Sequence, residues 1–172
     1  LQYVWHKVLH VYGNSNQTTV GVTISGRNLP VNGIESSVGL YINTLPLMVE
    51  HRQIDHKNKS LIDAIKGIQD NINEINSRSN INLARLQKDG KRLFDSLFIY
   101  ENYPNFTSEE QINKLKISFK GGIEKLDYPL AVIAYEANNE LLFKLIYAGE
   151  LFDDDIIGDV LSVVKTLLEQ VA

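Results

Sequence analysis

The chain has 172 residues, of which 44% are hydrophobic and 22% are charged, and its formal net charge at pH 7 is −4. This length and composition suit one globular domain. The absence of cysteine excludes disulfides, thiolate metal sites and cysteine nucleophiles. The sequence has no basic run of the kind that binds nucleic acid and no apolar stretch long enough to cross a bilayer, so we expect a cytoplasmic protein with no nucleic-acid or membrane partner.

The first part of the chain reads as a helix followed by two strands. Apolar residues at three- and four-residue spacing predict a helix over residues 1–12 with one buried face. β-Branched residues predict a strand over 18–25. Residues 40–49 are almost continuously apolar, which predicts a second strand that is buried on both faces.

A helix with a clear start signal follows. Ser60 and Asp63 have the spacing of a capping box. The helix carries an apolar stripe formed by Leu61, Ile65, Ile68, Ile72 and Ile75. The stripe covers too few heptads for a coiled coil, so it predicts a helix that faces the core. A short helical turn over 83–86 is expected next.

The second part of the chain is rich in strand patterns. We predict strands over residues 93–100, 115–120, 130–136 and 141–147, with a hairpin turn over 137–139. Residues 105–111 are the best candidate for a mobile loop. The predicted apolar face of a final helix consists of Ile156, Val160, Val163, Leu167 and Val171. Six strands and three substantial helices predict an α/β fold: a two-layer sandwich in which helices pack on a mixed β-sheet.

Four histidines and an aspartate run are the candidates for a metal site. His6 and His10 have the i, i+4 spacing that can grip zinc, but Lys7 stands where a general-base glutamate would be, and we interpret them as a surface pair. His51 and His56 are expected to be solvated. The run over residues 153–155 is explained by capping of the final helix, since helix N-termini favour carboxylates. We therefore expect no metal.

Two further polar residues stand out. Asn43 lies within an apolar strand pattern and must find hydrogen-bond partners. From the residues alone, a structural asparagine and one that orients a substrate in a cleft are equally good interpretations. Arg27 is by default an exposed turn residue, and otherwise an anchor for a phosphate or a carboxylate.

Three ordered segments give the sequence a family resemblance. They are VTISGR (22–27), VGLYINTLP (38–46) and LFDSLFIYENYP (93–104), supported by a weak match at 79–87 and by the tail from Leu141. In this order they resemble the C-terminal half of the condensation domain of nonribosomal peptide synthetases. The match at 79–87 lacks the usual His, Gln and Asp-Tyr-Pro residues. The family's catalytic HHxxxDG motif is absent, because no two histidines are adjacent in this chain.

The resemblance implies a fold and a set of partners. It implies one lobe of a chloramphenicol acetyltransferase-like acyltransferase, with residues 1–172 as the C-terminal subdomain and the N-terminal lobe missing. The chain starts within a predicted helix, which also indicates a fragment. In the family, two lobes enclose a tunnel in which the phosphopantetheine arms of peptidyl or acyl carrier proteins meet. The implied partners are therefore carrier proteins, the other lobe and adjacent synthetase domains, with no cofactor bound directly.

The resemblance also assigns roles to individual residues. Asn43 is expected to line the tunnel near the reacting groups, with Thr44 and Tyr41 as neighbours. It would position the reacting groups rather than act as a general base, because an amide does not titrate usefully. Arg27 is expected to be a structural anchor. No catalytic residue is expected in this fragment, which should be inactive alone. A non-catalytic docking module for carrier proteins is the alternative, and an acyltransferase that uses coenzyme A is a third class.

Overall fold

The computed structural model describes residues 1–27, 30–34, 36–54, 59–101, 126–137 and 139–171. Within these ranges, five strands form one mixed sheet in the order β2-β1-β3-β4-β5. Their bounds are β1 Gln17–Ile24, β2 Asn43–Glu50, β3 Ser96–Glu101, β4 Leu130–Ala137 and β5 Glu140–Tyr147. The β1–β2 and β4–β5 pairs are antiparallel, whereas β1–β3 and β3–β4 are parallel.

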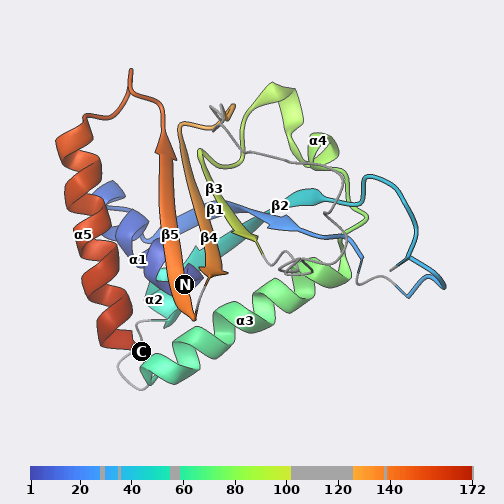
Figure 1. Cartoon of the computed structure of the whole chain (residues 1–172), viewed down its shortest axis with the longest axis horizontal. Helices are drawn as coiled ribbons and strands as arrows, with labels where there is room; N and C mark the ends of the chain where they lie inside the picture. Colours follow the sequence, from blue (N-terminus) through green and yellow to red (C-terminus); the bar gives the residue numbers. More distant parts are fainter. Residues whose placement is uncertain (28–29, 35, 55–58, 102–125, 138, 172) are drawn as a thin grey trace, which may run out of the picture.

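Among the described residues, three long helices pack on one face of this sheet, as the view in Figure 1 shows. The helices are α1 Gln2–Gly13, α3 Leu61–Ser77 and α5 Asp154–Val171, and the short ones are α2 His51–Ile54 and α4 Leu83–Leu86. Both α1 and α5 pack on β1, β3 and β4 around Trp5, Phe98 and Val132, whereas α3 packs through Ile68 on β1 and β2. The predicted α/β sandwich of a mixed sheet and packed helices is therefore what the chain forms.

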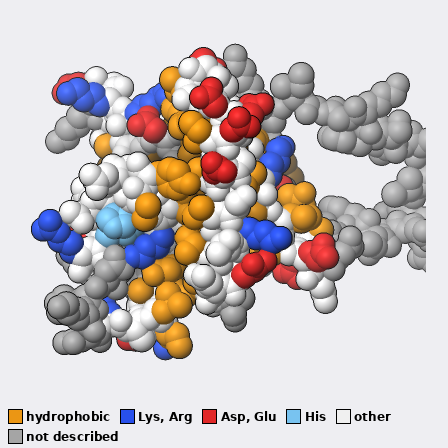
Figure 2. All heavy atoms as spheres, turned by 90° about the vertical axis from the view of Figure 1, so that its left-hand side faces the viewer, with side chains coloured by type: hydrophobic (Ala, Val, Ile, Leu, Met, Phe, Trp, Pro, Cys, Tyr) orange, Lys and Arg blue, Asp and Glu red, His pale blue; other side chains and the backbone are white. Residues whose placement is uncertain are grey.

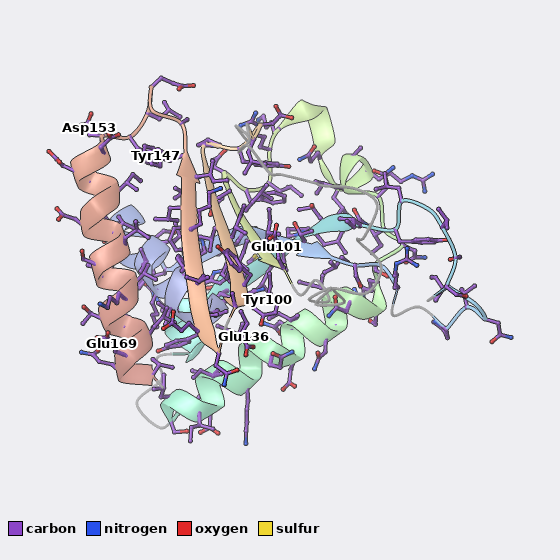
Figure 3. The ribbon with its side chains drawn as sticks, in the orientation of Figure 1. Tyr100, Glu101, Glu136, Tyr147, Asp153 and Glu169 are labelled. Atoms are coloured by element: carbon purple, nitrogen blue, oxygen red, sulfur yellow. The ribbon has the colours of Figure 1, made fainter. Side chains whose placement is uncertain are left out.

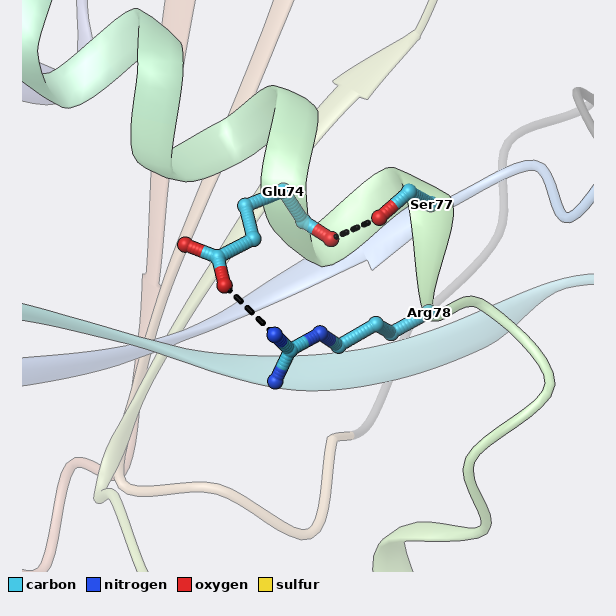
Figure 4. A network of polar contacts seen from close by, with 3 residues as sticks. All are labelled: Glu74, Ser77 and Arg78. Atoms are coloured by element: carbon cyan, nitrogen blue, oxygen red, sulfur yellow. Dashed lines mark hydrogen bonds and ion pairs between the residues drawn. The ribbon is translucent and has the colours of Figure 1, made fainter.

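The predicted start of α3 is confirmed. The Ser60 side chain accepts a hydrogen bond from the Asp63 backbone N–H, and the Asp63 carboxylate accepts from the Ser60 backbone and hydroxyl. These hydrogen bonds lower the pKa of Asp63. At the other end, the Ser77 hydroxyl donates to the Glu74 carbonyl and Arg78 forms a 2.7 Å ion pair with Glu74 (Figure 4). Local side-chain contacts thus mark both ends of α3.

The prediction that residues 40–49 form a strand buried on both faces is wrong. The strand begins only at Asn43, and its faces alternate, with Leu45, Leu47 and Val49 buried but Met48 54% exposed. The physical reason is that β2 is an edge strand with helix α3 on one face only. Its Pro46 fits an edge, where a missing backbone donor is tolerated.

The predicted face of the last helix is rotated from the observed one. In α5 the buried residues are Ile157, Val160 and Val164, whereas Ile156 and Val163 are 47% and 38% exposed. The helix carries apolar residues over a wider arc than the sheet can cover. In Figure 2, which looks at the molecule from the side of α5, hydrophobic side chains accordingly form a band on the surface. Periodicity alone did not show where within this arc the contact is centred.

The other predicted elements have mixed outcomes. Helices over 1–12 and 83–86 and strands over 18–25, 130–136 and 141–147 are confirmed within one or two residues, and the strand predicted over 93–100 runs from Ser96 to Glu101. The hairpin turn between β4 and β5 contains Asn139 with φ 61°. The predicted strand 115–120 and the predicted loop 105–111 lie outside the described residues.

Candidate functional site

The residues singled out by the sequence meet at one end of the β1–β2 hairpin. In the antiparallel register Ile24 pairs with Asn43, so the segment after β1 and the segment before β2 lie together. Arg27 follows β1 by a turn at Gly26, whose φ is 67°. A methyl group at Gly26 would overlap the carbonyl oxygen of Tyr41, so only glycine allows this close approach.

Arg27 holds the connection between the two strands. Its Nη1 donates to the carbonyl oxygens of Ile34, at 2.6 Å, and of Ser37, at 3.0 Å. Its guanidinium carbon lies 4.7 Å from the centroid of the Tyr41 ring. The Ser37 hydroxyl lies 2.8 Å from the Tyr41 hydroxyl. We call Arg27, Ser37 and Tyr41 the clamp.

Asn43 forms a second set of contacts, which we call the tie. Its Nδ2 donates to the carbonyl oxygens of Ser79, at 2.8 Å, and of Ile81, at 2.6 Å. Its Oδ1 accepts from the backbone N–H of Thr44 at 2.8 Å. The tie therefore joins the first residue of β2 to the turn that follows α3. Thr44 itself is half-buried and pairs with Thr23 of β1.

Three aliphatic side chains between the clamp and the tie point away from the protein. Val38, Leu40 and Ile42 are 101%, 91% and 58% exposed, and we call them the ridge. The apolar run over residues 40–49 predicts Leu40 and Ile42 inside a buried strand, and their exposure shows that this prediction is wrong. An exposed cluster of large apolar residues is typical of an interaction surface.

The geometry brings together all four residues that the sequence had selected, Arg27, Tyr41, Asn43 and Thr44. Sequence reasoning missed Ser37, Ser79 and Ile81, which supply the hydrogen-bond partners. The contacts of Asn43 with Ser79 and Ile81 span 36 and 38 residues, so no local sequence pattern predicts them. Whether Asn43, Thr44 and Tyr41 line a tunnel is not tested by these contacts and stays a prediction.

The other end of the same hairpin holds a cluster of histidines. His6 and His51 are 0% and 1% exposed, and the Thr18 hydroxyl lies between them, 2.7 Å from His6 Nδ1 and 2.9 Å from His51 Nε2. The ring of His10 stacks on that of His51, with centroids 4.1 Å apart. The predictions that His6 belongs to a surface pair and that His51 is solvated are therefore wrong. His56 lies outside the described residues.

Shared use of one hydroxyl couples the two buried rings. Thr18 has a single proton to donate, so one ring accepts it and the other must donate its own N–H to the hydroxyl oxygen. Burial, and secondarily the charge of His51, lower the pKa of His6 to about 3. His6 Nε2 is buried without a hydrogen-bond partner in the part of the chain that is described. A neutral, enclosed ring of this kind serves packing rather than proton transfer.

The aspartate run lies at the start of α5, as predicted. Asp154 and Asp155 occupy the first turn of the helix. The Tyr147 hydroxyl at the end of β5 donates to Asp154 Oδ1 at 2.7 Å, which raises the pKa of Tyr147. In Figure 3, Tyr147 lies beside the start of α5, which Asp153 marks. Within the described ranges, no group of three or more His, Asp or Glu side chains is arranged to hold a metal ion.

None of the helices in the described ranges combines the length and the hydropathy needed to cross a bilayer.

Comparisons with known proteins agree on one family. The family model described as "Condensation domain" matches residues 1–172. The chain is 48% identical, over 99% of its length, to N-(5-amino-5-carboxypentanoyl)-L-cysteinyl-D-valine synthase of Amycolatopsis lactamdurans. It is 49% identical, over 100% of its length, to the enzyme of the same name from Penicillium rubens. The chain spans about 5% of the length of each of these relatives.

A solved structure shows the same fold. The first condensation domain of the calcium-dependent antibiotic synthetase, in complex with a substrate analogue, matches 99% of this chain with a TM-score of 0.70 at 14% identity. The match covers 38% of that structure's chain. The predicted chloramphenicol acetyltransferase-like fold class is confirmed.

Proposed function

The chain belongs to the condensation domain family of nonribosomal peptide synthetases, and from that premise we propose that it is the C-terminal lobe of a peptide-bond-forming condensation domain. The observation that carries the proposal is the family match over residues 1–172, at a length that covers 38% of a solved condensation domain. The remaining part of such a domain would form the second lobe.

The proposed reaction joins two carrier-bound acyl groups. The amine of the acceptor aminoacyl thioester attacks the carbonyl carbon of the donor thioester, a C–N bond forms and the C–S bond breaks. The sulfur of the broken C–S bond takes up the proton that the amine loses, so the donor arm leaves as a free thiol. A histidine pair that could orient or deprotonate the amine is absent from this sequence. The lobe alone is therefore proposed to be inactive.

The ridge supports a two-lobe assembly. Val38 and Leu40 are 101% and 91% exposed. Their apolar surface is removed from water only when another surface covers it. The clamp and the tie hold their backbone on both sides, so the ridge is presented rather than left to collapse onto the protein. We propose that the ridge faces the second lobe and the tunnel between the lobes.

The site residues follow from the same arrangement. We propose that Asn43, Thr44 and Tyr41 belong to the tunnel wall and that Arg27 is a structural anchor. The two carbonyl contacts of Arg27 support the anchoring role. The proposed partners are peptidyl or acyl carrier proteins with their phosphopantetheine arms and adjacent synthetase domains.

The relatives suggest a class of product. Both are named as synthases of a cysteinyl-valine peptide that carries a substituted pentanoyl group. At 48% and 49% identity over nearly the whole chain, we propose that this lobe contributes to amide formation in a synthase of a similar short peptide.

The test is a condensation assay with purified parts. The complete domain, with two loaded carrier proteins, is expected to give a dipeptidyl thioester that mass spectrometry detects, whereas this chain alone gives none. Product from this chain alone would contradict the proposal. Carrier binding by the complete domain without product would indicate a docking module, and equal turnover with soluble coenzyme A thioesters would indicate a carrier-independent acyltransferase.

A further inference from the structure

The segment before β2 has its polar and apolar side chains on unexpected sides. Val38, Leu40 and Ile42 point outward, whereas Tyr41 and Asn43 are half-buried and bonded to the protein itself. Alternation of this kind normally places apolar residues inward. Here the inward side chains, Tyr41 and Asn43, fix the backbone, and the outward side chains of the ridge are free to contact another surface.

The tie leaves Asn43 with no donor for a substrate. The amide has two N–H groups, and the carbonyl oxygens of Ser79 and Ile81 accept both, at 2.8 and 2.6 Å. The amide oxygen already accepts from Thr44 N–H. Swinging the side chain toward a substrate would leave the Ser79 and Ile81 carbonyls without these hydrogen bonds, which is unfavourable for groups that are shielded from water.

The clamp restrains the segment from the other side. Tyr41 is held by the Arg27 guanidinium over its ring and by the Ser37 hydroxyl. Its backbone carbonyl lies against Gly26, where no side chain would fit. Ile42 is therefore the one residue between two fixed neighbours, and its side chain is 58% exposed.

From these contacts we infer that Asn43 and Tyr41 are positioning residues that act through Ile42, and that Ile42 is the side chain of this segment that touches the reacting partners. This inference rests on the proposed function, because it assigns roles within the proposed tunnel wall. It differs from the expectation that the Asn43 amide itself orients a substrate.

A double-mutant cycle in the complete condensation domain tests the inference. Asn43→Ala and Ile42→Ser are each expected to lower kcat/KM about tenfold, because each removes the contact that Ile42 makes in the transition state. Because both changes remove the same contact, the double variant should be no more than about twofold worse than either single variant. Multiplied effects, about a hundredfold in the double variant, would overturn the inference.

The cycle has a matched control. Val11, in α1, is 71% exposed and lies outside this site. Val11→Ser is expected to leave kcat/KM unchanged and to combine with Asn43→Ala without coupling. Coupling as strong as that of Ile42→Ser would mean that Asn43→Ala disturbs the whole lobe, and it would also overturn the inference.

A second measurement does not depend on condensation activity. In the complete domain, Asn43→Ala should speed amide hydrogen exchange in residues 41–44 and 79–84, whereas Ile42→Ser should leave it unchanged. Unaltered exchange in Asn43→Ala would refute the tie as a positioning device. If the native domain makes no amide bond, the proposed function fails while this exchange result still stands.

Discussion

Polar side chains turn inward at both ends of the β1–β2 hairpin, but the two ends differ in what they leave exposed. At the end near Gln17 and Glu50, polar rings and a hydroxyl are closed inside the protein, with His6 and His51 at most 1% exposed. At the end near Ile24 and Asn43, polar groups also turn inward, but they hold a ridge of exposed aliphatic side chains. The first arrangement encloses polar groups, and the second leaves apolar side chains exposed. The comparison predicts that substitutions at the first end change stability, and those at the second end change function.

The largest effect on stability is expected for Thr18→Val. The change keeps the shape of the side chain but removes the hydroxyl between His6 and His51. The free energy of unfolding should fall by about 3 kcal/mol, since a buried group left unpaired costs roughly 1–3 kcal/mol. Urea unfolding of the complete domain measures it, with Thr19→Val on the other face of β1 as the control. A loss below that of the control would mean that the cluster is not stabilising.

Acid should weaken the same end. The pKa of His6 is about 3 in the folded chain, below its ordinary value of 6.5. The unfolded chain therefore takes up a proton that the folded chain refuses, so stability is present above pH 6.5 and is lost as the pH falls toward 3. His6 contributes a loss of about 2 kcal/mol between pH 7 and pH 5, at roughly 1.4 kcal/mol per pH unit.

Comparison of the urea midpoints of the native domain and of His6→Asn at pH 7 and pH 5 measures this contribution. The variant keeps an amide nitrogen near the position of Nδ1 but cannot take up the proton. An equal pH dependence in both proteins would show that another group carries the effect.

Arg27→Ala tests the end of the hairpin near Ile24 and Asn43. It removes the donor that holds the Ile34 and Ser37 carbonyls, and a half-buried charged donor of this kind is worth about 1–2 kcal/mol. We expect a modest loss of stability together with a larger loss of kcat/KM than stability explains. The control is Arg78→Ala, whose ion pair with Glu74 lies on the surface and is worth less than about 0.5 kcal/mol. Full activity in Arg27→Ala would show that the clamp does not contribute to condensation.

Ile42→Ser should have the smallest effect on stability and still matter for turnover. The side chain is 58% exposed, so its replacement should lower the free energy of unfolding by less than about 0.5 kcal/mol. Thermal unfolding and the condensation assay, run on the same preparation, separate the two effects. A large fall in the unfolding temperature would place Ile42 with the structural residues of the first end.

Sequence reasoning succeeded where the signal was local. The capping box of Ser60 and Asp63 was found as predicted. The predicted apolar stripe of α3 was confirmed only in part, because Ile68 is buried and Ile72 and Ile75 pack beside it, whereas Leu61 in the first turn is 41% exposed. Family resemblance selected the segment that contains Tyr41 and Asn43. The burial of His6 and His51 could not be predicted, because it depends on Thr18, which is 12 and 33 residues away.

The ridge was missed for a related reason. An apolar run normally indicates burial, and the sequence of residues 40–49 gives no sign that the strand starts only at Asn43. The orientation of Leu40 and Ile42 depends instead on contacts of their neighbours with Arg27, Ser79 and Ile81. Local pattern specifies the elements here, whereas long-range polar contacts decide which faces stay open.

The mixed sheet has a consequence for the order of folding. The hairpins β1–β2 and β4–β5 join strands that follow one another along the chain, whereas the parallel β1–β3 pair, which includes Gly21 and Leu97, closes a much longer loop. Long loops lose more entropy on closure. We therefore expect two hairpin units to form early and the β1–β3 seam to form last. Gly21, over which the Phe94 ring packs so closely that no side chain would fit, lies at that seam, where the two units meet.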